Sequence, residues 1–349
     1  MKKILIIDDS ALMRRVLSVI IDKTNEYMVS YTASNGVEGL EILERCDDIS
    51  VCLCDINMPR MDGLELLEVV RKKNIKVPFV VISSSEYAKD TITALELGAI
   101  EFIKKPKRML GETDSAFVGK LTRALDMAVE SRREHTICNK RVIYSEASNS
   151  KTLKHSGGGK LVALVCSTGG PKALQHVIPK LPKNLSTPVL VVQHMPAGFT
   201  NTMALRLNDI SEITVKEAED GEYIRSGVVY IARGGTHLTL QQEGKQSRIV
   251  FDDSPPVMGL KPCGNIMYNS LINSFYDEII CVVLTGMGAD GTKGIRGLAK
   301  TNDIFVIAQD ENSSTVYGMP KAVYEAGLTD CVCDINDIAN EIVKKVGVL

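Results

Sequence analysis

Three polar residues of the kind that make up a hydrolytic site stand far apart in the sequence, each after a run of apolar residues. Ser167 and His194 follow such runs directly, and Asp290 follows a third run through a glycine-rich turn. A neutral imidazole can accept the proton of a serine hydroxyl while a carboxylate fixes the tautomer of the ring. These residues are therefore candidates for a nucleophile, a general base and the partner that orients the base.

The residues around Ser167 favour this chemistry but leave other interpretations open. Gly169, Gly170 and Pro171 predict a tight turn into a helix, whose free backbone N–H groups could hold a developing oxyanion. Val165 stands two residues before the serine, so the segment is not the Gly-x-Ser-x-Gly elbow of the α/β-hydrolases. The alternatives are a serine that only caps a helix, a core histidine, and a glycine loop that cradles phosphate.

A second group of residues predicts an acidic pocket opposite a lysine. Asp8, Asp9 and Asp55 each stand at the carboxyl end of an expected strand, as do Ser83 and Lys105. Converging carboxylates repel one another unless a cation compensates, and hard oxygen ligands favour Mg²⁺. Metal and lysine together could neutralise a phosphoryl group on one carboxylate. The alternative is that the aspartates cap a helix or open a turn and that the lysine is a surface charge.

The elements that must position these residues are short apolar strands that alternate with helical patterns. In the first part of the chain, strands are expected over 3–7, 51–54, 77–82 and 101–104, with helices over 12–21 and 63–72. In the second part, strands are expected over 161–165, 188–193, 227–232, 279–284 and 303–309. This alternation predicts two α/β domains, each a doubly wound parallel sheet with helices on both faces. Functional residues then belong at the carboxyl ends of the strands.

The segment between the two series has a different composition. Residues 104–160 carry 13 Lys and Arg against 6 Asp and Glu, and three glycines at 157–159 are typical of a flexible hinge. We expect a helix over 115–133 and a linker from about 136 to 159. The domains predicted from this organisation are 1–120, a helix and basic linker over 121–159, and a second domain over 160–349.

Composition narrows the class of protein. The chain has 349 residues, with 41 Lys and Arg against 43 Asp and Glu, and this near balance argues against a nucleic-acid-binding protein. No apolar run approaches the ~20 residues of a membrane span, and the first apolar run stops at two aspartates, which argues against export. The nine cysteines include two Cys-x-Cys pairs and lack zinc-knuckle spacing. We expect neither disulfides nor zinc, and a cytoplasmic location.

The motifs of the first part resemble the receiver domain of response regulators. The segments that carry the resemblance are Ile7-Asp8-Asp9-Ser10, Asp55 to Gly63, Ser83 and Lys105-Pro106. The resemblance covers residue 1 to about 120 and implies a flavodoxin-like fold. It implies that Asp55 accepts phosphate from a histidine kinase and that Asp8, Asp9 and Asp55 hold Mg²⁺. It also implies that Ser83 and Phe102 are the switch residues and that Lys105 contacts the phosphate.

The motifs of the second part resemble the catalytic domain of the chemotaxis protein-glutamate methylesterase family. The segments that carry this resemblance are Cys166 to Pro171, Gln193 to Pro196, Leu284 to Gly291, Ala308 to Asp310 and Tyr317 to Pro320. It covers about 160–347 and implies a Rossmann-like esterase domain without a cofactor. Ser167 is then the nucleophile, His194 the general base and Asp290 its partner. Backbone N–H groups near Thr168 and Met287 are the implied oxyanion donors.

The sequence departs from the family pattern in two places. The family usually has His-Arg-Pro-Ser-Val-Asp after its Pro-Pro-Val, whereas the segment from Leu260 to Asn265 reads Leu-Lys-Pro-Cys-Gly-Asn. Arg233 stands where a proline is usual. We therefore expect differences in substrate contacts or receptor choice rather than in the reaction.

The two resemblances together imply a phosphorylation-activated hydrolase. It would remove methyl esters from glutamate side chains of methyl-accepting chemotaxis receptors, and could also deamidate glutamine. The first domain would cover the active-site edge of the second, and phosphate on Asp55, which carries about −1.5 to −2 charge, would weaken that packing. Two other classes stay open: a non-catalytic module that binds receptors or a kinase, and a DNA-binding regulator that uses the basic linker. The serine, histidine and aspartate argue against the first, and the lack of a helix-turn-helix pattern argues against the second.

Overall fold

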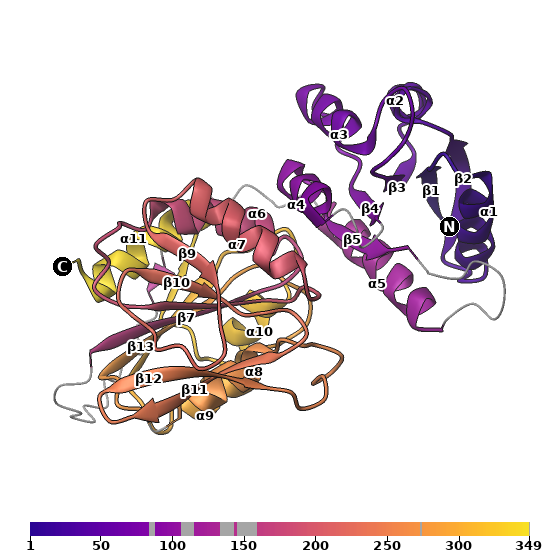
Figure 1. The fold of residues 1–349 in the computed structure, drawn as a ribbon. Coiled ribbons are helices and arrows are strands. Elements are labelled where there is room, and N and C mark those ends of the chain that lie inside the picture. Colours follow the sequence, from indigo (N-terminus) through magenta and orange to yellow (C-terminus); the bar gives the residue numbers. More distant parts are fainter. Residues whose placement is uncertain (84–87, 106–114, 133–142, 145–158, 273, 349) are drawn as a thin grey trace. The chain divides into compact units, whose positions relative to one another are not determined.

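The computed structural model describes residues 1–83, 88–105, 115–132, 143–144, 159–272 and 274–348. The chain divides into two compact units, Met1–Glu134 and His135–Leu349 (Figure 1). Each unit is built around its own parallel sheet. Within the described residues, no helix is both long and apolar enough to span a bilayer.

The first unit alternates strands and helices along the chain. Its elements are β1 (Lys2–Ile7), α1 (Ala11–Asp22), β2 (Tyr27–Ala33), α2 (Gly36–Arg45), β3 (Ile49–Asp55), α3 (Gly63–Lys72), β4 (Phe79–Ser83), α4 (Ala88–Leu97), β5 (Glu101–Lys104) and α5 (Ser115–Ser131). The strands lie in the order β2-β1-β3-β4-β5 and all pair in parallel. This is the flavodoxin-like order, with its topological switch point between β1 and β3.

Local sequence explains where these elements begin. Ile4 to Ile7 are fully buried, as expected for a strand covered on both faces. The Ser10 side chain accepts a hydrogen bond from the backbone N–H of Met13 and so caps α1. Asp62 and Glu65 form a reciprocal capping box at the start of α3. The caps therefore start both helices close after the carboxyl ends of β1 and β3.

The second unit is larger. Its elements are β6 (Ile143–Tyr144), β7 (Lys160–Cys166), α6 (Gly170–Val177), a 3₁₀ turn (Ile178–Lys180), β8 (Val189–Gln193), α7 (Phe199–Asp209), β9 (Thr214–Glu217), β10 (Val228–Ile231), β11 (His237–Glu243), β12 (Gln246–Asp252), α8 (Gly264–Ser270), β13 (Glu278–Val283), α9 (Thr292–Leu298), β14 (Ile304–Gln309), α10 (Met319–Glu325), β15 (Cys331–Cys333) and α11 (Ile335–Val346). The main sheet has the order β6-β15-β14-β13-β7-β8-β10-β9, in which only the β6–β15 pair is antiparallel among the described strands.

Helices cover both faces of this sheet. The helices α6, α7 and α11 lie on one face and α8, α9 and α10 on the other, beside the antiparallel hairpin β11–β12 (Figure 1). Leu238 and Ile249 of the hairpin join one buried core with Val165 and Tyr268. The chain leaves β7 toward β8 and later returns to β13 on the other side of β7. The switch point of the second sheet therefore lies between β7 and β13, where ligands bind in folds of this kind.

The architecture confirms the predicted pair of doubly wound α/β folds and differs from the sequence prediction in detail. The expected linker falls mostly on residues outside the described ranges, but Ile143–Tyr144 within it forms β6 and pairs with β15. The hairpin β11–β12 and the strands β2 and β9 were not predicted. The eight cysteines among the described residues are free thiols.

Candidate functional site

Ser167 and His194 follow adjacent parallel strands at the same level. Cys166 and Gln193, the last residues of β7 and β8, are partners in the sheet register, and the backbone N–H of His194 donates to the carbonyl of Cys166 at 3.3 Å. Residues at equivalent positions on neighbouring strands project to the same side of a sheet. The fold thus brings a half-buried serine and a histidine from distant parts of the sequence onto one edge.

Asp290 completes the arrangement from the loop after β13. Nε2 of His194 lies 2.8 Å from Oδ2 of Asp290, and the two side chains are only 7% and 4% exposed. The loop itself reaches Ser167, because the Ser167 N–H donates to the carbonyl of Thr285 at 3.0 Å. The His194 and Asp290 side chains therefore contact each other at this edge of the second sheet, and the loop that carries Asp290 bonds to the backbone of Ser167.

The carboxylate of Asp290 is held ionised by several donors. Oδ2 accepts the backbone N–H of Gly264 at 2.6 Å, and Oδ1 accepts those of Asn265 and Gly291, each at 2.9 Å. Burial by itself would raise the pKa of Asp290, but the hydrogen bond and charge of His194 and these backbone donors outweigh it. The pKa is lowered to about 2.

The contact with Asp290 decides which nitrogen of His194 can act as a base. An ionised carboxylate only accepts hydrogen bonds, so Nε2 carries the ring proton. Nδ1 then holds a lone pair, and it is buried without a hydrogen-bond partner among the described residues. The carboxylate thus places the ring proton on Nε2 and leaves Nδ1 as the candidate base, which reverses the roles that the two nitrogens have in the serine-protease triad.

Close backbone packing brings the 286–288 turn against Ser167. A methyl group on Gly286 would lie 2.7 Å from Cβ of Ser167, so only glycine fits there. On the other side, Gly169 adopts φ +78° and the N–H of Gly170 donates to the Ser167 carbonyl at 2.7 Å. Thr168 directly follows Ser167, and Met287 directly follows Gly286, so both belong to the segments that these contacts hold together.

The residues that hold Asp290 were not among those predicted from the sequence. Cys263, Gly264 and Asn265 precede α8 or open it, and the thiol of Cys263 donates to Oδ1 of Asp290 at 3.1 Å. Burial and the neighbouring carboxylate raise the pKa of this thiol to about 12, so it remains a donor. The sequence did single out this segment, because Leu260–Asn265 departs from the family pattern, but it did not indicate a contact with Asp290.

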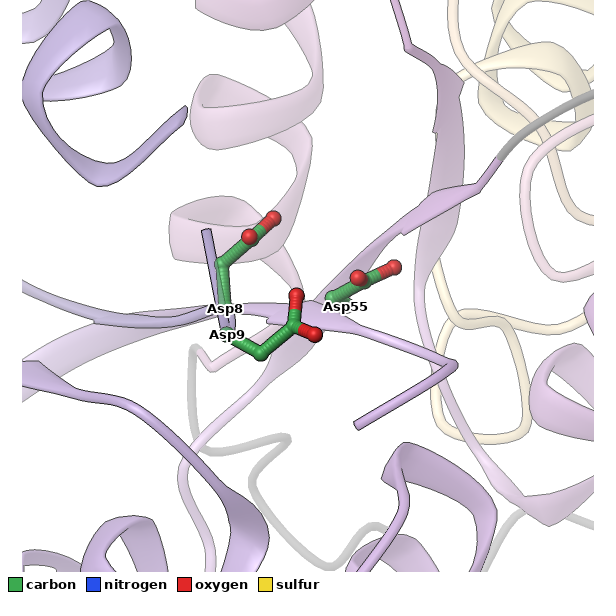
Figure 2. Close-up of side chains that lie close together, drawn as sticks. All are labelled: Asp8, Asp9 and Asp55. Carbon is green, nitrogen blue, oxygen red and sulfur yellow. The ribbon is translucent and has the colours of Figure 1, made fainter. Parts of the chain in front are cut away.

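The acidic residues of the first unit also converge. Asp8 and Asp9 follow β1, Asp55 ends β3, and one carboxylate oxygen from each lies within 4.8 Å of the others (Figure 2). Asp8 and Asp55 are buried and Asp9 is exposed. Three hard oxygen donors at one sheet edge with an exposed side fit a divalent cation such as Mg²⁺.

A lysine faces two of these carboxylates. Nζ of Lys105 lies 2.6 Å from Oδ2 of Asp55 and 3.2 Å from Oδ2 of Asp8. Burial raises the pKa of Asp55 against the opposing effect of this lysine. Burial opposes the charge on Lys105, but the two carboxylates outweigh it and raise the pKa of the lysine. The pocket thus pairs negative charge with one fixed cation.

The two predicted switch residues lie on neighbouring strands. Ser83, the last residue of β4, is buried and accepts a hydrogen bond from the Thr91 hydroxyl at 2.8 Å. Phe102 of β5 is half-buried and is the register partner of Val81. The Lys105 N–H donates to the Ser83 carbonyl at 2.8 Å, which ties this edge of the sheet to the acidic pocket.

Comparison with known proteins matches both units. The family model described as CheB methylesterase matches residues 162–342, and the one described as response regulator receiver domain matches residues 4–110. Curated proteins named protein-glutamate methylesterase/protein-glutamine glutaminase from Geobacillus kaustophilus and Pyrococcus abyssi are each 38% identical to this chain. Each alignment covers 99% of this chain, with 99% and 93% of those proteins respectively.

A solved structure agrees with the second match. The Thermotoga maritima CheB methylesterase catalytic domain is 42% identical, with a TM-score of 0.53, and covers 54% of this chain and 100% of that one. The chain thus combines a receiver domain with a methylesterase domain whose candidate site lies at the edge of an open α/β sheet. The chain belongs to the CheB methylesterase family.

Proposed function

We propose that this chain hydrolyses methyl esters on glutamate side chains of methyl-accepting chemotaxis receptors, and that the same site deamidates glutamine side chains. The observation that carries the proposal is the hydrogen bond between Nε2 of His194 and Asp290, which leaves the lone pair of the buried Nδ1 available. His194 follows the end of β8, and the register partner of that end on β7 directly precedes Ser167. The names of the full-length relatives support the same reaction.

The first half of the reaction transfers the acyl group to the protein. The Ser167 hydroxyl adds to the ester carbonyl carbon as its proton moves to Nδ1 of His194, and Asp290 stabilises the imidazolium that forms. Backbone N–H groups of Thr168 and Met287 hold the negative charge that develops on the carbonyl oxygen. His194 then returns the proton to the methoxy oxygen, the C–O bond breaks, and methanol leaves.

The second half restores the serine. Water gives a proton to Nδ1 of His194 and adds to the acyl carbon, and the glutamate carboxylate is released as Ser167 regains its proton. Deamidation follows the same route, except that the leaving group is ammonia. The reaction needs no cofactor, because Ser167, His194, Asp290 and the backbone donors supply every proton transfer and charge contact.

For the first unit, we propose that Asp55 accepts a phosphoryl group from a histidine kinase. Asp8, Asp9 and Asp55 would hold Mg²⁺, which neutralises phosphoryl oxygens when bound, and Lys105 would contact the phosphate. The spacing of the carboxylates and the position of Lys105 support this assignment. Phosphorylation of Asp55 then raises the hydrolytic activity of the second unit.

Methanol release from methyl-labelled receptor membranes tests the proposed reaction. We expect Ser167→Ala to lower the rate by at least about 10³-fold, because it removes the nucleophile while the rest of the site remains. Ser186→Ala is the matched control, since Ser186 bonds to the carbonyl of Val346 near the end of α11, away from the site. A Ser167→Ala protein that keeps the wild-type rate contradicts the proposal.

A further inference from the structure

Thr285 makes hydrogen bonds to several backbone groups around Ser167. It follows β13, is 1% exposed, and uses both backbone groups and its hydroxyl. Its carbonyl accepts the Ser167 N–H at 3.0 Å. Its hydroxyl donates to the Thr168 carbonyl at 3.0 Å and accepts the N–H of Val316 at 3.0 Å. A single buried threonine thus connects three backbone segments.

The segment after Thr285 is the turn that contacts Ser167. The N–H of Gly286 donates to the Val316 carbonyl at 3.0 Å, and the N–H groups of Gly318 and Met319 donate to the Gly286 carbonyl at 3.1 and 2.8 Å. A methyl group on Gly318 would lie 2.7 Å from the Gly286 carbonyl oxygen. The turn is therefore clamped against the start of α10, and Thr285 fixes its distance from Ser167 and Thr168.

Gln309, on the neighbouring strand β14, accepts a hydrogen bond from Thr285. It is the last residue of β14, is 1% exposed, and its Oε1 accepts the Thr285 N–H at 2.8 Å. Its Nε2 donates to the Ser313 carbonyl at 2.8 Å. The motif from Ala308 to Asp310, which the catalytic residues leave unexplained, thereby receives a role, because Gln309 bonds directly to the backbone beside the site.

We propose that Thr285, supported by Gln309, is a positioning residue for the proposed hydrolysis. Its hydroxyl sets the spacing between the backbone of Thr168 and the turn that carries Met287, the two segments that supply the oxyanion donors. The inference rests on the proposed function and adds to it. Thr285 does not touch the substrate; it acts through the backbone groups that do.

Thr285→Val is the change that isolates this role. Valine has nearly the same shape but no hydroxyl, so the Thr168 carbonyl and the Val316 N–H lose their shared partner while the packing remains. A displacement of the oxyanion donors weakens only transition-state binding, so it lowers kcat and leaves KM nearly unchanged. A purely structural loss would lower the fraction of folded protein and would not change kcat per folded molecule.

The experiment measures methanol release by the full-length chain with methyl-labelled receptor membranes, together with the rate at which a fluorophosphonate labels Ser167. We expect Thr285→Val to lower kcat and the labelling rate by about 10- to 100-fold with KM within about twofold. Thr285→Ser, which keeps the hydroxyl, restores most of the rate. Thr329→Val is the matched control, because the Thr329 hydroxyl is buried and has no hydrogen-bond partner within the described chain.

The outcomes separate the inference from the function on which it rests. A wild-type protein that releases no methanol overturns the proposed function and the inference with it. An active wild type with an equally active Thr285→Val, or a Thr285→Ser as slow as Thr285→Val, overturns the inference alone. Should Thr285→Val fail to fold, Gln309→Met replaces it by removing the acceptor of the Thr285 N–H, and an unchanged kcat in that variant overturns the inference.

Discussion

At the scale of single residues, the two oxygens of Asp290 have different partners. Oδ1 accepts two backbone N–H groups and the Cys263 thiol, whereas Oδ2 accepts the Gly264 N–H and faces Nε2 of His194. An asparagine here would keep its carbonyl oxygen at the position of Oδ1, where three donors meet. Its NH₂ group would then face Nε2 of His194, which must become an acceptor, and the ring proton would move to Nδ1.

We predict that Asp290→Asn lowers kcat by about 10⁴-fold, because the ring proton on Nδ1 removes the base that Ser167 needs. Since the pKa of Asp290 is about 2, the wild-type carboxylate stays ionised above about pH 4, and its titration does not shape the pH profile of kcat/KM there. Methanol release measures the fall in kcat, and ¹⁵N NMR of His194 shows which ring nitrogen carries the proton. Asp209→Asn, at an exposed position, is the control. A fully active Asp290→Asn would disprove this assignment of the tautomer.

The sequence indicated the candidate catalytic residues more readily than the residues that hold them in place. Ser167, His194 and Asp290 could be proposed because their chemistry is rare and each follows a strand. Thr285, Gln309 and the backbone donors at 264 and 265 could not, because a buried threonine or glutamine has no distinctive pattern until the strands are paired. The order of the strands in the sheet decides which of them are neighbours, and that order is set by long-range packing.

At the scale of elements, the turns after strands need glycines for close backbone contact. Gly63 opens α3, and a methyl group there would lie 2.3 Å from the carbonyl oxygen of Asp55. Because that atom belongs to the backbone of β3, the clash cannot be relieved by rotating a side chain. Gly63 thus lets the capped start of α3 approach the end of the strand that carries Asp55.

We predict that Gly63→Ala destabilises the first unit by about 1–3 kcal/mol through this clash. Gly119→Ala is the matched control, because Gly119 lies within α5 and no atom of the described residues lies within 4 Å of a methyl group added there. It should stabilise the unit by about 0.5–1 kcal/mol. Calorimetry of the full-length chain measures both shifts. Equal stability of the two variants would contradict the account of this turn.

Strands could be predicted from the sequence where their residues are apolar throughout. Runs buried on both faces, such as Leu161–Cys166, are apolar throughout and were recognised. The edge strand β2 and the hairpin β11–β12 mix exposed and buried positions, so their sequences resemble loops. Strand β6 is two residues long and depends on pairing with β15, which no local pattern reveals.

At the scale of the whole molecule, the chain carries two candidate sites on separate sheets, each at a switch point. A phosphoryl group on Asp55 would carry about −1.5 to −2 charge in place of the single negative charge of the carboxylate, within a pocket that already holds two other carboxylates. Coupling between two sites typically amounts to about 1–3 kcal/mol, or about 5- to 150-fold in the coupled equilibrium. A coupling free energy of this size is enough for the proposed activation by phosphorylation.

Methanol release before and after addition of acetyl phosphate with Mg²⁺ tests the whole account most directly. We predict a rise of about 5- to 150-fold in the wild type. Asp55→Ala should show no rise, and Ser167→Ala should show almost no release in either state. A rise that persists in Asp55→Ala would contradict the regulatory claim, and acetyl-phosphate-stimulated release by Ser167→Ala would contradict the claim that Ser167 carries out the reaction.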